Sequence, residues 1–121
     1  MANPNIAAAT SILGHTIYGS IGTSLTEVLE NAASSNTIVK VNSVVIINQD
    51  GSNAADVSMA ISDASGGSAN FIAKLITVPG QTNLVLISAD MRIYLTDDKA
   101  LNLQASAVSD LAYCISYEVI S

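Results

Sequence analysis

From Thr37 onward the chain alternates apolar and polar residues, the period-two pattern of strands whose successive side chains point to opposite faces. Turn-forming pairs such as Asp50-Gly51 and Pro79-Gly80 bound these short runs. The pattern predicts strands near residues 38–47, 56–62, 70–78, 84–87, 92–95, 100–105 and 111–120. Residues 16–21 and 25–29 are two further strand candidates, although the second also suits a helical turn.

Short strands with turn signals every roughly eight to twelve residues are typical of two antiparallel sheets packed face to face. We therefore expect an all-β fold, an antiparallel β-sandwich or jelly roll with about seven or eight strands. No linker-like stretch divides the chain. Residues 1–10 are predicted to form an N-terminal extension and residues 11–121 a single β-sandwich domain.

Some predicted strands are apolar on both faces, notably within residues 44–47 and 71–76. One face of a sandwich strand packs the core, whereas the other usually meets water and is polar. A second apolar face indicates burial against a neighbouring protein. A central strand beneath a long loop would show the same pattern, so both interpretations remain open at this point.

The charge balance argues against some partners. Four Lys and Arg against ten Asp and Glu give a net charge of −6, and the four basic residues are scattered along the chain. Binding to nucleic acid needs clustered positive charge, so we expect no nucleic-acid partner. The apolar runs are too short to cross a bilayer, and no basic cluster precedes the apolar residues near Ile6, so we expect no membrane partner and synthesis in the cytoplasm of the host cell.

Only 12% of the residues are charged, which is about half the usual share in soluble domains. A surface so poor in charge suggests that other protein covers much of it. An oligomer is therefore expected, and a trimer is our working hypothesis.

Few residues in the chain are candidates for catalysis or metal binding. His15 is the sole histidine and has no ligand or carboxylate partner nearby in the sequence, so a turn or surface position is favoured over a site. Cys114 lies within a predicted strand and is interpreted as a packing residue. We expect no enzymatic activity, no catalytic residues, no metal and no cofactor, because no acid, base and nucleophile set is apparent.

Three weaker patterns favour the same conclusion. The acidic turns 50–53 and 97–98 lack the ligand spacing of a calcium loop. Gly14, Gly19 and Gly22 are not followed by the lysine or helix of a phosphate-binding loop. Tyrosines stand at positions 18, 94, 113 and 117, and core or interface roles are favoured for them over a sugar-binding platform.

The second half of the chain carries a series of motifs. They are Ser65-Gly66-Gly67-Ser68-Ala69-Asn70-Phe71-Ile72-Ala73-Lys74, Val78-Pro79-Gly80, Leu101-Asn102-Leu103-Gln104-Ala105-Ser106-Ala107 and the closing Ser116-Tyr117-Glu118. In this order they resemble the small β-sandwich virion structural proteins of tailed bacteriophages, including cyanophages. The likeness spans about the last 85 residues. The corner lacks an alanine, and the Asp97-Asp98-Lys99 turn lacks a glycine, that such proteins carry.

The resemblance implies a virion protein whose main partners are other virion proteins, above all the capsid protein, which it would decorate or cement. The alternative is a baseplate or tail-fibre component, such as a receptor- or carbohydrate-binding module. We predict that the interface uses exposed strand-face residues and the small residues of the N-terminal segment 2–10. The interface candidates are Ala2, Asn3, Pro4, Asn5, Ile6, Ile72 and Ile76.

Overall fold

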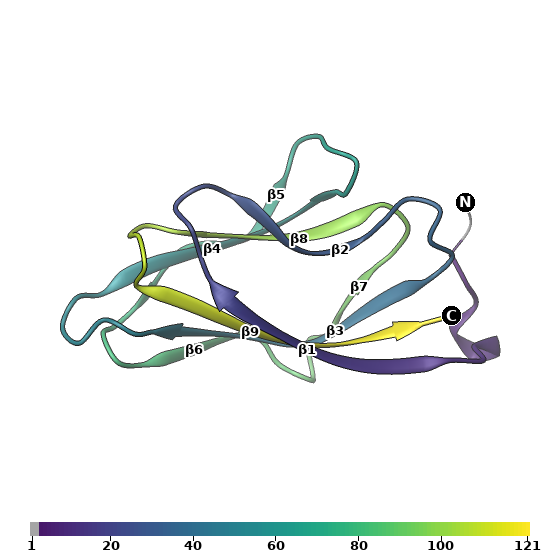
Figure 1. The fold of residues 1–121 in the computed structure, drawn as a ribbon, viewed down its shortest axis with the longest axis horizontal. Helices are drawn as coiled ribbons and strands as arrows, with labels where there is room; N and C mark the ends of the chain where they lie inside the picture. Colours follow the sequence, from purple (N-terminus) through teal and green to yellow (C-terminus); the bar gives the residue numbers. More distant parts are fainter. Residues whose placement is uncertain (1–2) are drawn as a thin grey trace.

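The computed structural model describes residues 3–121 and consists of two antiparallel sheets packed face to face (Figure 1). One layer contains β1, β9, β3, β6 and β7, and the other contains β2, β8, β4 and β5. The strands are β1 Ile12–Ser20, β2 Thr26–Asn31, β3 Ile38–Asn48, β4 Ala55–Asp63, β5 Asn70–Val78, β6 Asn83–Ile87, β7 Ile93–Leu95, β8 Lys99–Ala105 and β9 Leu111–Ile120. This architecture confirms the predicted all-β sandwich.

The strand orders are β1-β9-β3-β6 and β2-β8-β4-β5, so most connections cross from one sheet to the other as in a jelly roll, while β4 to β5 and β6 to β7 stay within one sheet. The described chain has nine strands, slightly above the seven or eight expected. The count reaches nine because both N-terminal candidates form strands; β6 and β7, which were predicted separately, lie one after the other beside β3 and pair with residues 44–47 and 39–41 respectively. The turn after Ser88 interrupts what would otherwise be a single edge strand.

Side chains from both sheets fill one core between the layers. Its fully buried members include Val44 and Ile46 of β3, Met59 of β4 and Leu103 of β8. Burial of alternate residues explains the period-two pattern, because inward positions exclude water while outward positions meet it. In β3, accordingly, Val44 and Ile46 are buried whereas Ile47 is exposed.

Two buried asparagines join the sheets at their ends. Asn31 of β2 donates from Nδ2 to the carbonyls of Thr37 and of Leu95, at 2.7 and 2.9 Å, and Leu95 belongs to the opposite sheet. Asn48 of β3 donates to the carbonyl of Val78, which ends β5 in the other sheet, at 2.8 Å. A buried amide must be hydrogen-bonded to offset its desolvation, so these contacts hold the sheet ends together.

The N-terminal third differs from the prediction in one respect. The first strand begins at Ile12, several residues before the predicted 16–21, while residues 26–31 form a strand and no helical turn. His15 therefore lies within β1. The early part of β1 escaped detection because its residues 12–16 are all exposed, so burial imposes no alternation on them.

The segment before β1 is attached to the rest of the chain. Residues 6–8 form a 3₁₀ helix, and Asn5 caps it by accepting a hydrogen bond from the backbone N–H of Ala7. The backbone amides of Thr10 and Ser11 donate to the carbonyl of Ser121. Asn3 accepts a hydrogen bond from the backbone N–H of Asp97 through its side chain.

Candidate docking groove

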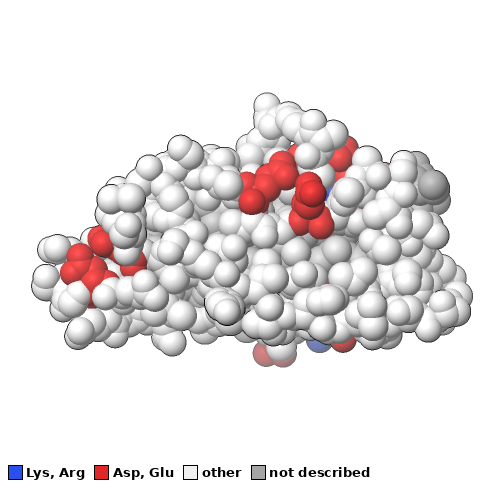
Figure 2. All heavy atoms as spheres, viewed as in Figure 1, with Lys and Arg blue, Asp and Glu red and all other residues white. Residues whose placement is uncertain are grey.

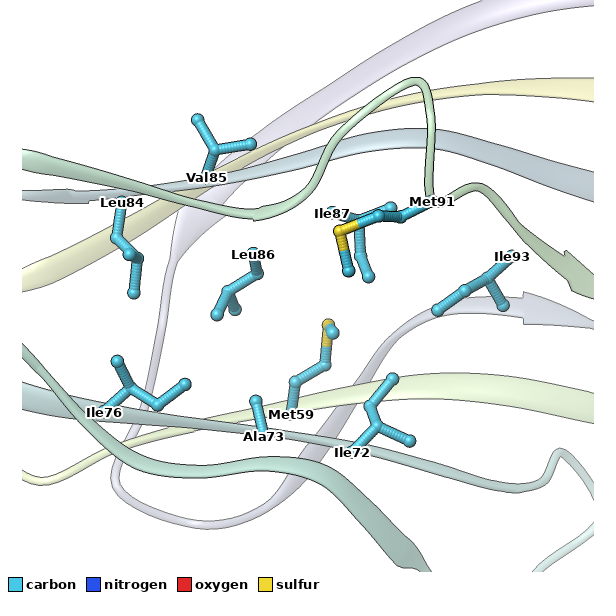
Figure 3. Close-up of a pocket in the computed structure, with 10 residues that line it drawn as sticks. All are labelled: Met59, Ile72, Ala73, Ile76, Leu84, Val85, Leu86, Ile87, Met91 and Ile93. Atoms are coloured by element: carbon cyan, nitrogen blue, oxygen red, sulfur yellow. The ribbon is translucent and has the colours of Figure 1, made fainter.

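A groove of about 400 Å³ opens between β5 and β6, the strands at corresponding edges of the two sheets (Figure 3). Ten residues line it, and all are apolar. They are Met59, Ile72, Ala73, Ile76, Leu84, Val85, Leu86, Ile87, Met91 and Ile93. Leu84 and Leu86 of β6 face Ile72 and Ile76 of β5 across the gap, whereas Val85 points away from them.

The groove lies between two edge strands that pair with their own sheets and not with each other. β5 is irregular: its pairing with β4 shifts register twice, on either side of Met59. Leu75 adopts a positive φ of 52°, and its backbone N–H donates to the side-chain oxygen of Ser58 at 2.9 Å. Such bulges bend an edge strand and increase its local twist.

Large apolar side chains are left in contact with solvent along this side. The exposed fractions are 49% for Ile72, 54% for Val85 and 60% for Met91. Leu75 on the outward side of β5 is 61% exposed. Scattered exposed apolar residues are normal, but a continuous apolar patch marks a surface that another molecule covers.

The predicted interface residues separate into two groups. Ile72 and Ile76 both line the groove. Asn3, Asn5 and Ile6 are exposed and Pro4 is half-buried, but none of them lines the groove. Ala2 lies outside the described residues. The role of all seven in an interface stays a prediction.

The groove also contains residues that the sequence did not single out. Leu84 and Leu86 of β6 and Met91 of the following turn belong to this set. The short unbroken apolar run 84–87 was a signal, since an edge strand that is apolar on both faces needs a cover. Only the position of β5 in the fold shows which face of residues 84–87 borders the groove.

His15 and Cys114 take no part in this groove. His15 is exposed on β1 and stacks on Tyr117, with the ring centroids 5.2 Å apart. Cys114 is half-buried and lies beside Tyr18 and Val45 in the register of the sheet. No cluster of three or more metal-ligating side chains occurs in the described part of the chain.

The two acidic turns use their carboxylates to hold loops. Asp50 accepts hydrogen bonds from the backbone amides of Ser52 and Asn53, at 2.9 and 3.3 Å, and these bonds lower the pKa of its carboxyl group. Asp98 accepts from the backbone N–H and the hydroxyl of Ser65, both at 2.8 Å. The side chain of Asp97 accepts from the backbone N–H of Ser34. Carboxylates engaged in this way act as polar turn residues.

The tyrosines do not form one platform. Tyr113 and Tyr117 pack against the core, while Tyr18 and Tyr94 are exposed. Tyr18 pairs with β9 beside Val45 of β3, whereas Tyr94 pairs with Lys40 of β3. Three strand spacings and five residues separate these positions, which is roughly 20 Å. A sugar ring cannot stack on both.

Comparisons with known proteins bear on the fold. No family profile and no curated protein sequence matches the chain. Among solved structures, a protein from Bacillus endospore appendages, described as a novel family of disulfide-linked pili, has a similar fold. It superimposes with a TM-score of 0.55 at 9% identity, over 99% of this chain and 96% of that one. At this identity the likeness extends to the fold alone.

No helix in the described residues is long and apolar enough to span a membrane.

Proposed function

We propose that this chain is a non-enzymatic structural subunit that docks on neighbouring proteins of a larger assembly, as a decoration or cement protein on a bacteriophage shell. The observation that carries the proposal is the apolar groove between β5 and β6. Small-molecule sites combine apolar walls with a few placed polar groups that orient the ligand. A lining with no polar side chain suits a protein partner better than a substrate.

Docking would be driven by burial of apolar surface. Covering exposed carbon gains about 25 cal/mol for each Å² removed from water. Ile72 and Met91 offer exposed apolar surface of this kind in the groove, and Val85 adds exposed apolar surface where it points away from β5. A protein that binds only the assembled shell stabilises that state by mass action, which is how a cement protein acts.

The placement on a virion rests on the ordered motifs of residues 65–121 that resemble phage structural proteins. The capsid protein is accordingly the proposed partner. The low content of charged residues, 12%, also supports a surface that other protein covers.

The first test uses purified particles of the phage whose genome encodes the chain. Mass spectrometry should detect the chain in them, and electron cryomicroscopy should place its density on the capsid lattice. Density confined to the tail or baseplate would contradict the shell position and favour the receptor-binding alternative. Absence of the chain from the particles would contradict a virion role altogether.

A variant pair then tests the groove itself. Particles that carry Ile72→Lys/Ile76→Lys should retain less of the protein and release their genome at a lower temperature than wild-type particles. Ser52→Lys is the matched control, since Ser52 lies in the exposed β3–β4 turn outside the groove. A thermal melt of each purified variant checks that it folds. Equal retention of folded groove and control variants would refute the groove as the docking site.

A second candidate, a subunit of an extracellular filament, is favoured by the fold shared with the endospore appendage protein. That protein is described as building disulfide-linked pili. This chain has a single cysteine, so a disulfide can join two copies but cannot link a continuous series. A filament of this protein would have to rely on non-covalent contacts, and negative-stain microscopy of the concentrated protein would reveal it.

A further inference from the structure

Most edge strands of the described chain carry features that discourage pairing with another chain. β2 contains Glu27 and Glu30, and its pairing with β8 shifts register. β5 shifts register twice against β4. β6 and β7 are short, with five and three residues. Charges, bulges and shortness are the means by which edge strands avoid joining the sheet of another molecule.

β1 is the edge strand that lacks these features. Its nine residues pair with β9 without a register shift, and none of them is Asp, Glu, Lys, Arg or Pro. Most of its positions are exposed. Figure 2 shows acidic side chains gathered over β2, whereas the surface along β1 is largely uncharged. A long, regular and uncharged edge is one that a further strand can join.

Alternate residues of β1 present their backbone groups to this open edge. Just before β1, the N–H of Ser11 donates to the carbonyl of Ser121, and the N–H of Ser121 donates to the carbonyl of Ser11. Antiparallel strands alternate such doubly bonded pairs with residues whose groups point the other way. The register of β1 and β9 therefore directs the even-numbered residues of β1 to the open edge. They are Ile12, Gly14, Thr16, Tyr18 and Ser20.

An antiparallel pairing of β1 with the β1 of a second copy uses all of these groups in one register. Thr16 is the middle residue of Ile12–Ser20, so a two-fold axis at Thr16 places the full length of both strands side by side. Even-numbered residues then face even-numbered residues. About ten backbone hydrogen bonds can form, because each facing pair exchanges two.

In the same register the large exposed side chains of β1 fall opposite glycines. Tyr18 is 77% exposed and stands opposite Gly14 of the second copy, while Leu13 is 58% exposed and stands opposite Gly19. A β-carbon at Gly14 would meet no atom within 4 Å, so the space above it is open. The hydroxyl of Tyr113 lies 3.1 Å from where a β-carbon of Gly19 would be, so Leu13 of the second copy meets this ring. An aromatic side chain that covers a glycine stabilises paired strands.

The charge of the chain does not oppose this contact. Each copy has a net charge of −6, so two copies can associate only along a surface with few carboxylates. β1 and the adjacent β9 contain one, Glu118, and Lys40 forms a salt bridge with it at 3.5 Å. The β1 edge is therefore a place where two copies can approach each other with little repulsion.

We propose that β1 of one copy pairs with β1 of a second copy, antiparallel about a two-fold axis at Thr16, and joins the two five-stranded sheets into one continuous sheet. The contact is isologous, because each copy contributes the same strand, so it closes as a dimer and leaves no open β1 edge. The groove between β5 and β6 lies at the far edges and stays free for another partner. The proposal goes beyond the proposed function and does not depend on it.

Charge at the axis tests the register directly. Thr16 faces its own copy, so Thr16→Lys or Thr16→Glu brings two like charges together and should lower the dimer association constant about tenfold or more in analytical ultracentrifugation. Thr16→Ser should dimerise like the wild type. Ser68→Lys and Ser68→Glu, in the exposed loop between β4 and β5, are the charge controls and should also dimerise.

Mixing the two charged variants is the decisive measurement. Lysine faces glutamate in the mixed dimer, so an equimolar mixture of Thr16→Lys and Thr16→Glu should recover the association that each lacks alone. Thermal melts check that both variants are folded. If the mixture stays monomeric while both variants melt like the wild type, the proposal is wrong.

Hydrogen exchange of single amides shows whether the strand edge forms the contact. In the dimer the amides of Gly14, Thr16 and Tyr18 become hydrogen-bonded, so NMR should show their exchange slowing as the protein concentration rises. The amides of His15 and Ile17 face β9 in both states and should change little. A dimer in which this alternation is absent would contradict pairing through β1.

Further outcomes separate this inference from the proposed function. Thr16→Lys leaves the groove intact, so this variant should still bind particles. Ile72→Lys/Ile76→Lys should lose particle binding and still dimerise. A wild-type chain that stays monomeric at high concentration, or that forms the trimer of our working hypothesis, would overturn pairing through β1 without affecting docking on the shell.

Discussion

At the scale of single residues, two buried asparagines, Asn31 and Asn48, form hydrogen bonds that connect the two sheets. Asn31 is 2% exposed and Asn48 is 1% exposed, and each amide joins backbone from both sheets. Asn31 also accepts hydrogen bonds from the hydroxyls of Ser35 and Thr37. The sequence offered no way to distinguish these two from the exposed turn asparagines, because burial of a polar side chain is decided by what folds over it.

Replacing either asparagine should therefore be costly. Asn31→Leu or Asn48→Leu leaves buried carbonyls unpaired, and we expect the free energy of unfolding to fall by about 2–4 kcal/mol. Urea denaturation followed by circular dichroism measures it. Asn70→Leu, at an exposed position at the start of β5, is the control and should change stability little. A loss as small as that of the control would refute a structural role for the two amides.

At the scale of elements, the turn between β3 and β4 depends on one carboxylate. The backbone amides of Ser52 and Asn53 stabilise the charged form of Asp50 and hold the pKa of this group below its ordinary value. A lowered pKa in the folded state means that the unfolded chain takes up the proton more readily. The stability from this turn is thus present above the ordinary aspartate pKa of about 3.9 and is lost as the pH falls through the lowered value.

Asp50→Ala removes this pH-dependent contribution. The variant should be less stable than the wild type at neutral pH, and the difference should shrink as the solution is acidified below the wild-type pKa. Urea denaturation across this pH range, with Asp90→Ala as the exposed control, measures it. A stability difference that stays constant with pH would show that the carboxylate charge is not what holds the turn.

In the edge strands, the alternation of apolar and polar residues no longer indicates which residues are buried. In β3 the alternation of apolar residues largely agrees with burial, because one face of this central strand packs on the core, whereas in β4 polar Ser58 and Ser62 are buried as well. In β1 and β5 most positions are exposed whatever their polarity, so periodicity loses its connection to burial. The apolar character of residues 71–76 predicted burial against a neighbour, which stays a prediction, and the bulge at Leu75 has no signature in residue type.

At the scale of the whole molecule, β9 holds the first sheet together. It lies between β1 and β3 and pairs with both along almost its full length. Leu111 and Ile115 place its inner face in the core. Removing residues 111–121 would therefore expose two strand edges and open the core at once.

We expect the chain without residues 111–121 to lack a cooperative unfolding transition. Thermal denaturation by circular dichroism tests this, with removal of residues 1–5 as the control. Residues 3–5 belong to no strand, so this control should retain the transition, although it loses the hydrogen bond of Asn3 to the backbone of Asp97 and the Asn5 cap of the 3₁₀ helix. A cooperative melt of the shorter chain would show that the sheet does not require β9.

The class of fold and the approximate positions of most strands follow from the amino-acid sequence alone, because alternation of polarity is a local property of each chain segment. It also indicated that Ile72 and Ile76 belong to an unusually apolar strand. That β5 and β6 lie at corresponding edges and leave a groove, with β1 and β2 at the opposite edge, follows only from the folded molecule. The physical reason is that residues share a surface through pairings between segments far apart in the chain, and local alternation does not encode those pairings.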